Sequence, residues 1–434
     1  MKRTAFMFFL LIFTVLLSAQ TTYQLSVSEL FDKGIQNSLN IKSSIVKNEI
    51  ANDQKNLALK KRLPEIALKG SFGYVGTATV YDKNLSFLEH PTLPPWSQDY
   101  QVVLNQPLFE GGRIKKSITR ADLEKQLSDF SLEKDKSSLK LWLIGKYLDL
   151  FNFYKRGEVY QHNITEAKER LKNIQRMKEE GMITNNDVLR SQLAVSNYEL
   201  AYEEIKNNIT IASQQLDILL GMDETIIIEP DMNLLDMNMA LQSEDNYVNQ
   251  SYSEYPEIKI AKKNVELAQN NLSLTKSTYY PTLSFQAYNS FARPIPNVVP
   301  AQDFYMNVWG LGVSLSFNIS SFFSKKDNMN QAKRQISLSQ LAVEQEQQTI
   351  RTAVKAAYIK HKEALDRIKV LEKSMEQSNE NYRIVKNKYF NRLSILTDML
   401  DANAVQLDSE LQLTTAKTNA IYTYYQLQEI SGNL

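Results

Sequence analysis

The most constraining feature of this sequence is an internal duplication, because the same unit occurs twice with a constant shift of 211 residues. The segment 178–191 (KEEGMITNNDVLRS) aligns with 389–402 (YFNRLSILTDMLDA), which places Asp187 on Asp398. The same shift pairs Tyr147 with Tyr358, Ala121 with Ala332, Val102 with Val313, and Leu104 with Leu315. A constant shift over more than a hundred positions indicates a repeated architecture. We therefore expect two copies of one long unit, residues 20–221 and 246–434, joined by an irregular, acidic, methionine-rich link at 222–245.

The first 19 residues have the pattern of an export signal. Lys2 and Arg3 form a charged region, an apolar core follows from Ala5 to Leu17, and Ala19 ends a small-residue cleavage site. The alternative is an uncleaved anchor, but the apolar core is too short for a comfortable membrane span. The chain has no cysteine, which excludes disulfides, thiolate metal sites and a lipid-anchored lipoprotein. No later run is apolar and long enough to predict a transmembrane helix.

Charge and motif content argue against nucleic acid binding and against catalysis. Lysine plus arginine (50) nearly balances aspartate plus glutamate (49), so nucleic acid is not an expected partner. The histidines, His90, His162 and His361, lie far apart and form no metal-spaced pair. The glycine-containing segment 111–117 lacks the spacing of a phosphate-binding loop. We expect no enzyme activity, no cofactor and no metal site.

Each copy has the same order of expected elements. In the first copy a helix from about 28 to 62 stops at Leu63-Pro64, because proline disfavours helix in the residue before it. The other elements of the first copy are a β-hairpin at 64–110 with a Pro-rich loop at 82–99, a long helix at 113–180, and a returning helix at 185–220. In the second copy they are a helix that stops at Tyr280-Pro281, a hairpin at 281–320, a long helix at 325–391, and a helix at 395–430.

The long helices carry apolar residues at 3-4-3-4 spacing, the pattern of coiled coils. Ile164, Ala167, Leu171 and Ile174 correspond in the second copy to Met375, Ser378, Tyr382 and Val385. The returning helix at 185–220 has two apolar stripes, which is typical of a helix with a neighbour on each side, as in the wall of a tube. A long helical bundle is the alternative, and the helices alone leave both open.

The strands favour the tube. In 66–80 and 100–109 the apolar residues alternate with polar or small ones, and the same holds for 282–291 and 312–319. Strands of about ten residues with one apolar face fit a lipid-spanning β-barrel, although a half-buried sheet in a soluble domain has the same pattern. Four strands cannot close a barrel, since the smallest needs about eight. Several chains must then share one barrel, and three chains would give twelve strands.

With these marks the chain resembles the TolC-type outer-membrane efflux family, the outer membrane factors, over essentially all of the mature sequence. The marks are the duplicated unit, Leu63-Pro64-Glu65 and Tyr280-Pro281-Thr282 at the first strands, PLFEGG at 107–112, and TDMLDA at 397–402. The resemblance implies a mainly α, internally duplicated fold with transmembrane β: a homotrimer with a twelve-stranded barrel in the outer membrane, continued by a helical barrel in the periplasm. It also implies an exit duct that works with a periplasmic adaptor (membrane fusion protein) and an inner-membrane transporter of the RND, ABC or MFS class. Drug, metal-ion and protein export all fit.

The resemblance implies a gate at the two helix turns, formed here by Asp187, Tyr389, Asp398 and Asp401. Threefold symmetry would turn Asp398 and Asp401 into rings of carboxylates that attract cations. Helix capping is the alternative for Asp187, because Thr184-x-x-Asp187 fits a capping box. Packing at a heptad position is the alternative for Tyr389.

The second turn departs from the family pattern. The position that can hold a gate arginine is Ser394, and Arg392 replaces the turn glycine, so Arg392 is the cation that would take that place. Asn391 beside it is the residue expected to adopt the left-handed conformation of a turn. We expect the turn tips to expose apolar side chains at which the adaptor docks. The tip residues are Gly181, Met182 and Ile183 in the first copy, and Arg392, Leu393 and Ser394 in the second.

The rival function is a periplasmic coiled-coil adaptor or structural protein without a membrane barrel. Such a protein would also show long heptad helices after an export signal. It would lack the β-hairpin with alternating apolar and polar residues that each copy of this sequence carries. Solubility without detergent would separate the two.

Overall fold

The computed structural model describes residues 22–295 and 301–434, so the expected export signal lies outside the described residues. The described chain forms two compact units, each built from both repeats. The first unit contains residues 22–42, 135–250 and 352–434, and the second contains residues 43–134 and 251–351. The two longest helices contribute to both units.

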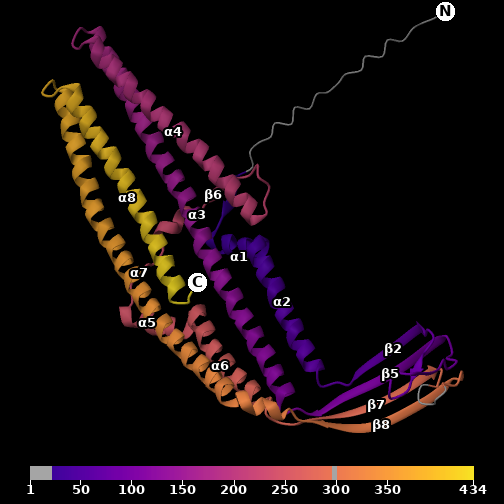
Figure 1. Ribbon diagram of the computed structural model, residues 1–434. Coiled ribbons are helices and arrows are strands. Elements are labelled where there is room, and N and C mark those ends of the chain that lie inside the picture. The colour runs from indigo at the N-terminus through magenta and orange to yellow at the C-terminus, as the bar shows by residue number, and fades with distance from the viewer. Residues whose placement is uncertain (1–21, 296–300) are drawn as a thin grey trace, which may run out of the picture. The chain divides into compact units, whose positions relative to one another are not determined.

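Long helices dominate the described chain (Figure 1). Their bounds are α1 (Val27–Asn37), α2 (Leu39–Lys60), α3 (Arg113–Glu179), α4 (Asn185–Leu220), α5 (Glu244–Glu254), α6 (Pro256–Ser277), α7 (Lys325–Phe390) and α8 (Leu396–Ile430). We expected a single helix over 28–62, but the structure has two helices there, α1 and α2, so this expectation was wrong. Ser38 has an extended ψ of 122° and its hydroxyl accepts the Ile41 N–H at 3.4 Å, so this serine ends α1 and caps α2.

The main sheet of the second unit is antiparallel, and its strands lie in the order β2 (Glu65–Tyr74), β5 (Trp96–Phe109), β7 (Thr282–Arg293) and β8 (Met306–Ser316) (Figure 1). The register aligns Leu68 with Val102 and Leu104 with Ala287. It also aligns Phe285 with Val313. Because side chains alternate along a strand, this register puts the apolar positions of all four strands on the same face of the sheet.

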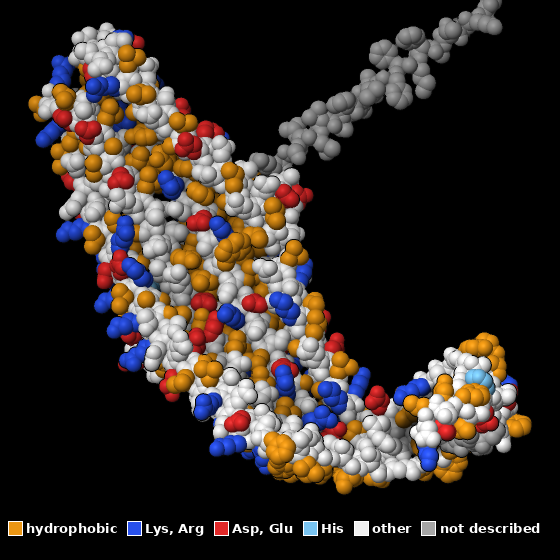
Figure 2. All heavy atoms as spheres, viewed as in Figure 1, with side chains coloured by type: hydrophobic (Ala, Val, Ile, Leu, Met, Phe, Trp, Pro, Cys, Tyr) orange, Lys and Arg blue, Asp and Glu red, His pale blue; other side chains and the backbone are white. Residues whose placement is uncertain are grey.

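Among the described residues no element covers that apolar face. The large side chains on it are exposed: Ile66, Leu68 and Phe72 on β2, Tyr100 and Val102 on β5, and Trp309, Leu311, Val313 and Leu315 on β8. Leu68 is 81% exposed and Leu315 is 70% exposed. Figure 2 shows hydrophobic side chains along the rim of the strands. A contiguous apolar surface of this kind indicates contact with lipid or with a partner.

Three strand boundaries differ from the expectation. β2 ends at Tyr74, not near residue 80, and β5 begins at Trp96, inside the expected loop. The Trp96 ring stacks on Phe72 at 5.2 Å and lies edge-on to Tyr74 at 5.3 Å, which fixes the end of the pairing. The loop between them contains a second small hairpin, β3 (Val80–Tyr81) and β4 (Phe87–Glu89). Ile319, expected on a strand, begins the 3-10 helix η2 (Ile319–Ser324).

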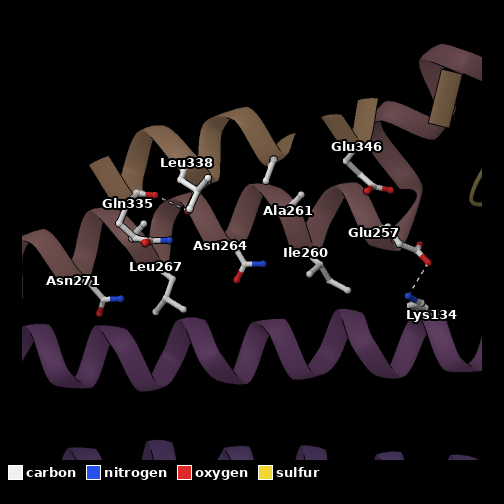
Figure 3. A pocket seen from close by; sticks show the side chains of 13 residues that line it. Lys134, Glu257, Ile260, Ala261, Asn264, Leu267, Asn271, Gln335, Leu338 and Glu346 are labelled. Carbon is white, nitrogen blue, oxygen red and sulfur yellow. Dashed lines mark hydrogen bonds and ion pairs between the residues drawn. The ribbon is translucent and has the colours of Figure 1, made fainter. Parts of the chain in front are cut away.

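Next to the sheet, the helices of the second unit follow the order of the strands. α2 leads into β2, α3 follows β5, α6 leads into β7, and α7 follows β8. α2 is joined to α3 by the ion pair Lys55–Asp122 at 2.7 Å. α3 is joined to α6 by Lys134–Glu257 at 3.2 Å, which closes one end of a groove of about 520 Å³ between α6 and α7 (Figure 3). The helices therefore lie side by side in the order α2, α3, α6, α7.

The first unit has a conventional buried core. β1 (Thr22–Leu25) pairs in parallel with β6 (Ile227–Pro230), inside the link that we expected to be irregular. Tyr147 of α3 is fully buried beside this pair, and its hydroxyl donates to the Leu25 carbonyl at 2.5 Å and accepts the Asp231 N–H at 2.7 Å. The link also contains η1 (Met232–Asp236). A helix core thus ties the start of the first repeat to the link between the repeats.

Candidate gate and docking tips

The two turns of the first unit have the same backbone geometry. Gly181 in the turn from α3 to α4 has φ 72°, and Arg392, its equivalent after the 211-residue shift, has φ 63°. The N–H of each bonds to the carbonyl three residues back at 2.9 Å, and the next N–H, of Met182 or Leu393, reaches back five residues at 2.8 Å. The left-handed residue of the second turn is therefore Arg392 and not Asn391, which corrects our expectation. It occupies the position at which glycine ends the first long helix.

The carboxylates of Asp187 and Asp398 cap the helices that follow the turns. Asp187 accepts the Thr184 N–H at 3.1 Å and the Thr184 hydroxyl at 3.0 Å. Asp398 accepts the Ser394 hydroxyl at 2.8 Å and the Ile395 N–H at 3.4 Å. Both carboxylates lie in the first turn of a helix, where the helix dipole favours negative charge. These contacts support the capping alternative for Asp187 and extend it to Asp398.

Asp401 differs from the two capping carboxylates. It lies three residues after Asp398 on α8, so the two side chains share one helix face. Asp401 is exposed, and within the described residues it makes no hydrogen bond or ion pair that would hold its carboxylate. Capping does not account for Asp401.

Tyr389 is packed inside the bundle near the turns. Only 5% of the residue is exposed, and it belongs to a cluster with Ile174, Val188, Tyr382, Leu396, Met399 and Ala402. Its hydroxyl has no hydrogen-bond partner among the described residues. Burial raises the pKa of Tyr389, and the nearby charge of Asp187 raises it further. The structure thus brings Tyr389 and Asp187 together across the two repeats and gives Tyr389 the packing role that its heptad position predicted.

The candidate docking residues fall into two groups. Leu393 is 77% exposed and Met182 is 45% exposed, whereas Ile183 is half-buried against the cluster that contains Tyr389. Arg392 donates from Nη2 to the Met182 sulfur at 2.9 Å, which joins the two turns. In the described protein Arg392 forms no ion pair, so the structure does not bring this cation to Asp398 or Asp401.

Sequence reasoning missed a buried polar layer one heptad away from Tyr389. Arg170 of α3 is 4% exposed and donates from Nη1 to the hydroxyl of Tyr382 on α7 at 2.8 Å. Burial raises the pKa of Tyr382 although the Arg170 charge opposes the shift. Asn403 of α8 donates to Asn163 of α3 at 3.4 Å in the same bundle. The signal was present, because a buried tyrosine at a heptad position needs a hydrogen-bond partner.

The described residues contain neither a metal-binding cluster nor a helix that could cross a membrane. Among residues 22–295 and 301–434, no group of three or more histidine or acidic side chains is arranged to hold a metal ion. Within the same ranges no helix combines the length and apolarity that crossing a membrane requires.

Comparisons with known proteins agree on one family. Residues 30–222 and 247–433 match the family described as outer membrane efflux protein, and these two segments make up most of the chain. A search of curated proteins by sequence found no match.

Several solved structures have the same fold. VceC, an outer membrane protein of Vibrio cholerae, aligns with a TM-score of 0.75 at 13% identity, covering 94% of this chain and 96% of that one. CusC aligns with a TM-score of 0.78 at 13% identity, covering 94% and 92%. The MtrE outer membrane channel of Neisseria gonorrhoeae, in its open state, aligns with a TM-score of 0.72 at 16% identity, covering 94% and 88%.

These findings confirm the expected fold class, a duplicated and mainly helical chain with transmembrane β-strands, and the expected outer-membrane location. They also place the chain among transport ducts and not among enzymes. This chain belongs to the outer membrane efflux protein family.

Proposed function

We propose that the protein is the outer-membrane exit duct of a tripartite efflux or type I secretion system. Three copies form one barrel and one periplasmic tunnel. The duct passively conducts substrates that an inner-membrane transporter of the RND, ABC or MFS class delivers through a periplasmic adaptor. The protein itself supplies no energy and no chemistry.

The observation that carries this proposal is the uncovered sheet of the second unit. Its order β2-β5-β7-β8 leaves β2 and β8 as edges with unpaired backbone groups. An open edge is not viable in lipid, because no water is present to satisfy its N–H and C=O groups. Pairing β8 of one copy with β2 of the next removes every edge, and three copies of four strands give a barrel of twelve.

A soluble coiled-coil adaptor explains the same residues less well. Leu68, Trp309 and Leu315 are each more than two-thirds exposed, and no described element packs on their face of the sheet. Burying apolar surface contributes roughly 25 cal/mol per Å², so a soluble protein with this face would aggregate or associate. Lipid satisfies the face without a protein partner.

We place the gate at the two turns, with Asp187, Tyr389, Asp398 and Asp401 as its residues. Asp398 and Asp401 supply the charge, since both are exposed and lie on one face of α8. In a trimer they become rings of carboxylates. Tyr389 and the capping contacts of Asp187 hold the turns in place.

We place adaptor docking at the tips of the same turns. Met182 and Leu393 expose apolar surface there, and the Arg392–Met182 contact presents the two turns as one surface. Helical tips of an adaptor would bury these side chains.

The test of the assembly is extraction of the full-length protein from outer membranes. We expect that only detergent releases it, and that its mass in detergent, measured by light scattering corrected for bound detergent, is that of three chains. A monodisperse monomer in plain buffer would overturn the proposal and favour the soluble adaptor.

A further inference from the structure

Positive charge is concentrated where the strands of the sheet join the helices of the second unit. The four joining segments, 60–65, 107–116, 274–282 and 317–327, contain nine lysines and arginines but only three acidic residues. Over the whole sequence the two kinds of charge are nearly equal, 50 against 49. One of the three acids, Glu110, is already paired with Arg113 at 2.9 Å. Figure 2 shows Lys and Arg side chains at the helix ends next to the strands, and we call these segments the basic collar.

The segment between β8 and α7 adds exposed aromatic rings to this charge. Residues 322–326 read FFSKK, and Phe323 is 89% exposed. The ring of Phe322 packs edge-on against the ring of Phe317, with 5.7 Å between the centroids. The ammonium group of Lys325 lies 4.8 Å from the centre of the Phe322 ring and 5.3 Å from that of the Tyr279 ring. These rings hold one lysine of the FFSKK segment on an aromatic surface.

The FFSKK segment lies on the side of the uncovered apolar face of the sheet. Val313, Leu315 and Phe317 alternate along the end of β8, so Phe317 continues that face. Phe317 contacts Phe322, and Phe322 contacts Lys325, which attaches this lysine to the apolar side. β8 has 11 residues, about the length that crosses the hydrocarbon core of a bilayer. η2 begins three residues after the end of β8 and so falls at the level of the lipid head groups.

The stability of α7 does not account for its two leading lysines. Lys325 and Lys326 begin α7, where the helix dipole favours negative charge and disfavours positive charge. Asp327 in the same turn is the favourable choice. Within the described residues neither lysine forms an ion pair. An anionic group from outside the chain would offset the unfavourable position of both lysines.

The first repeat has no equivalent of the FFSKK segment. The 211-residue shift places Gly111 on Phe322 and Gly112 on Phe323. A Cβ at Gly111 would lie 2.7 Å from the Cβ of Tyr280, so the turn of the first repeat has no room for a side chain there. Each copy of the chain therefore carries one FFSKK segment, and a trimer carries three.

We propose that the FFSKK segment anchors the protein in the periplasmic leaflet of the outer membrane by binding the phosphate group of an anionic phospholipid. Lys325 and Lys326 contact the phosphate, and the Phe323 ring enters the boundary between head groups and acyl chains. Aromatic rings prefer this boundary, and lysine side chains reach from it to the head groups. The rest of the basic collar strengthens the attraction for anionic lipid. The inference rests on the proposed barrel, because only a sheet in lipid brings η2 to the membrane surface.

The first test measures contact with lipid through single thiols, which the absence of cysteine from the chain makes possible. Phe323→Cys in the full-length protein is labelled with a fluorophore and reconstituted with phospholipids that are brominated near the head-group end of their acyl chains. We expect the bromines to quench the label. Leu315→Cys, on the apolar face of β8, should be quenched as well. Ser314→Cys, on the opposite face of the same strand, should not be quenched.

The outcomes of this test separate the anchor from the proposed function. Quenching at Leu315 without quenching at Phe323 overturns the anchor and leaves the duct intact. A neighbouring copy that covers the Phe323 ring would give that same result. Absence of quenching at Leu315 shows that the sheet is not in lipid, which overturns the proposed function itself.

The second test measures binding of the phosphate group. Short-chain phosphatidylglycerol is added to the detergent-solubilised trimer, and the rise in the temperature at which the trimer dissociates gives the half-saturating lipid concentration. A lysine near an anionic surface contributes ~1 kcal/mol, which is about fivefold in affinity. Lys325→Gln combined with Lys326→Gln should therefore raise the half-saturating concentration by more than about tenfold. The matched control is Lys355→Gln with Lys362→Gln, two exposed lysines farther along α7.

The exposed ring provides a variant that disturbs little of the fold. Phe323→Ser should raise the half-saturating concentration while the lipid-free trimer keeps its dissociation temperature, because the ring is almost fully exposed. An affinity that neither Phe323→Ser nor the lysine pair changes, or that the control pair lowers equally, overturns the site. Equal stabilisation by phosphatidylcholine or by inorganic phosphate overturns the choice of an anionic lipid. Each of these results is obtained on a trimer and leaves the proposed duct standing.

Discussion

The turns at Gly181 and at Arg392 have the same backbone and different side chains. The 211-residue shift aligns Arg392 with Gly181. It also aligns the two backbone hydrogen bonds of the second turn with those of the first. Around the first turn, Lys178 stays exposed and donates to Asn185 at 2.6 Å. Its equivalent at the second turn, Tyr389, is buried in the cluster. Duplication therefore fixed the path of the chain, while the side chains diverged into a polar surface at one turn and a packed core at the other.

The two turns are stabilised by different interactions. The first is held by a glycine without left-handed strain and by the contacts between Thr184 and Asp187. The second has an arginine in the left-handed region and isoleucine, which has no side-chain acceptor, as its N-cap residue. Burial of Tyr389, Leu396 and Met399 compensates there. We expect the first turn to respond to changes in capping and the second to changes in packing.

The largest effect should come from charge placed on the exposed tips. If both turns form one docking surface, Leu393→Asp abolishes export in cells, while the trimer reaches the outer membrane with an unchanged melting temperature. Ile183→Asp should abolish export and also lower the melting temperature, because Ile183 packs partly against the core. Minimum inhibitory concentration or secretion assays measure export. Leu85→Asp is the matched control, since Leu85 is an equally exposed leucine of the other unit. Normal export in both tip variants would contradict docking at the turns.

The next effect concerns the carboxylates of the second turn. Asp398→Ala combined with Asp401→Ala should lower the cation selectivity of single channels several-fold and weaken block by divalent cations from the periplasmic side. The corresponding change at the first turn, Asp187→Ala, should mainly cost about 1 kcal/mol of folding free energy through the lost cap. Planar-bilayer recording measures the selectivity. If the double variant loses stability and keeps its selectivity and its block, then Asp398 acts only as a cap and neither aspartate belongs to the gate.

A smaller effect on stability is expected near the C-terminal ends of the returning helices α4 and α8, where the two repeats differ in a buried side chain. Asp217 near the end of α4 is fully buried, and neither carboxylate oxygen has a partner among the described residues. Burial, with nearby Asp223 and Glu224, raises its pKa to about 6. The equivalent residue in the second repeat is the uncharged Gln428. The folded state thus binds the proton more tightly than the unfolded chain, where an aspartate titrates near ~4.

This linkage has a definite sign. The free energy of unfolding should fall as pH rises from about 4 to about 6, where Asp217 loses its proton, and should not fall further on this account above that range. Asp217→Gln should remove the fall and stabilise the protein at neutral pH by about 1–2 kcal/mol. Denaturation of the solubilised protein at several pH values checks this. A variant whose stability keeps the wild-type pH dependence would show that another group is responsible.

The smallest effect should come from exchange of the two left-handed residues. A residue with a Cβ costs roughly 1 kcal/mol in this conformation, and a Cβ at Gly181 would meet no atom within 4 Å. Gly181→Ala should therefore destabilise by about 1 kcal/mol, and Arg392→Gly should stabilise by a similar amount. Gly76→Ala is the control, because Gly76 has open space and no left-handed backbone. Equal responses at Gly181 and Gly76 would remove the conformational explanation.

The periodicity of apolar residues predicted most of the helices and strands. The features that it missed depend on local hydrogen bonds of single residues. The alternation in β8 predicted that Val313 and Leu315 share a face, because a strand offers a side chain only two directions. The break at Ser38 was missed because Asn37, Ser38 and Asn40 are weak helix formers that also occur inside long helices, and only the hydrogen bond of the serine hydroxyl marks the break. Arg392 was missed as the left-handed residue, because intrinsic preference favours asparagine and the duplicated hydrogen-bond pattern overrides it. The heptad position of Tyr382 indicates that its hydroxyl needs a partner, but local sequence does not identify that partner as Arg170 of the other repeat.

The contact between Arg170 and Tyr382 has a mechanical consequence. A slide of α3 by one turn past α7, about 5.4 Å, would take the guanidinium away from the Tyr382 hydroxyl, while Tyr198 of α4 also interacts with Arg170. Losing a hydrogen bond of a buried charged group costs about 1.5–3 kcal/mol, which is a large part of the stability of a small domain. The polar layer therefore fixes the position of α3 relative to α7 along their axes. We expect the two helices to tilt or unwind about this layer, and not to slide along each other.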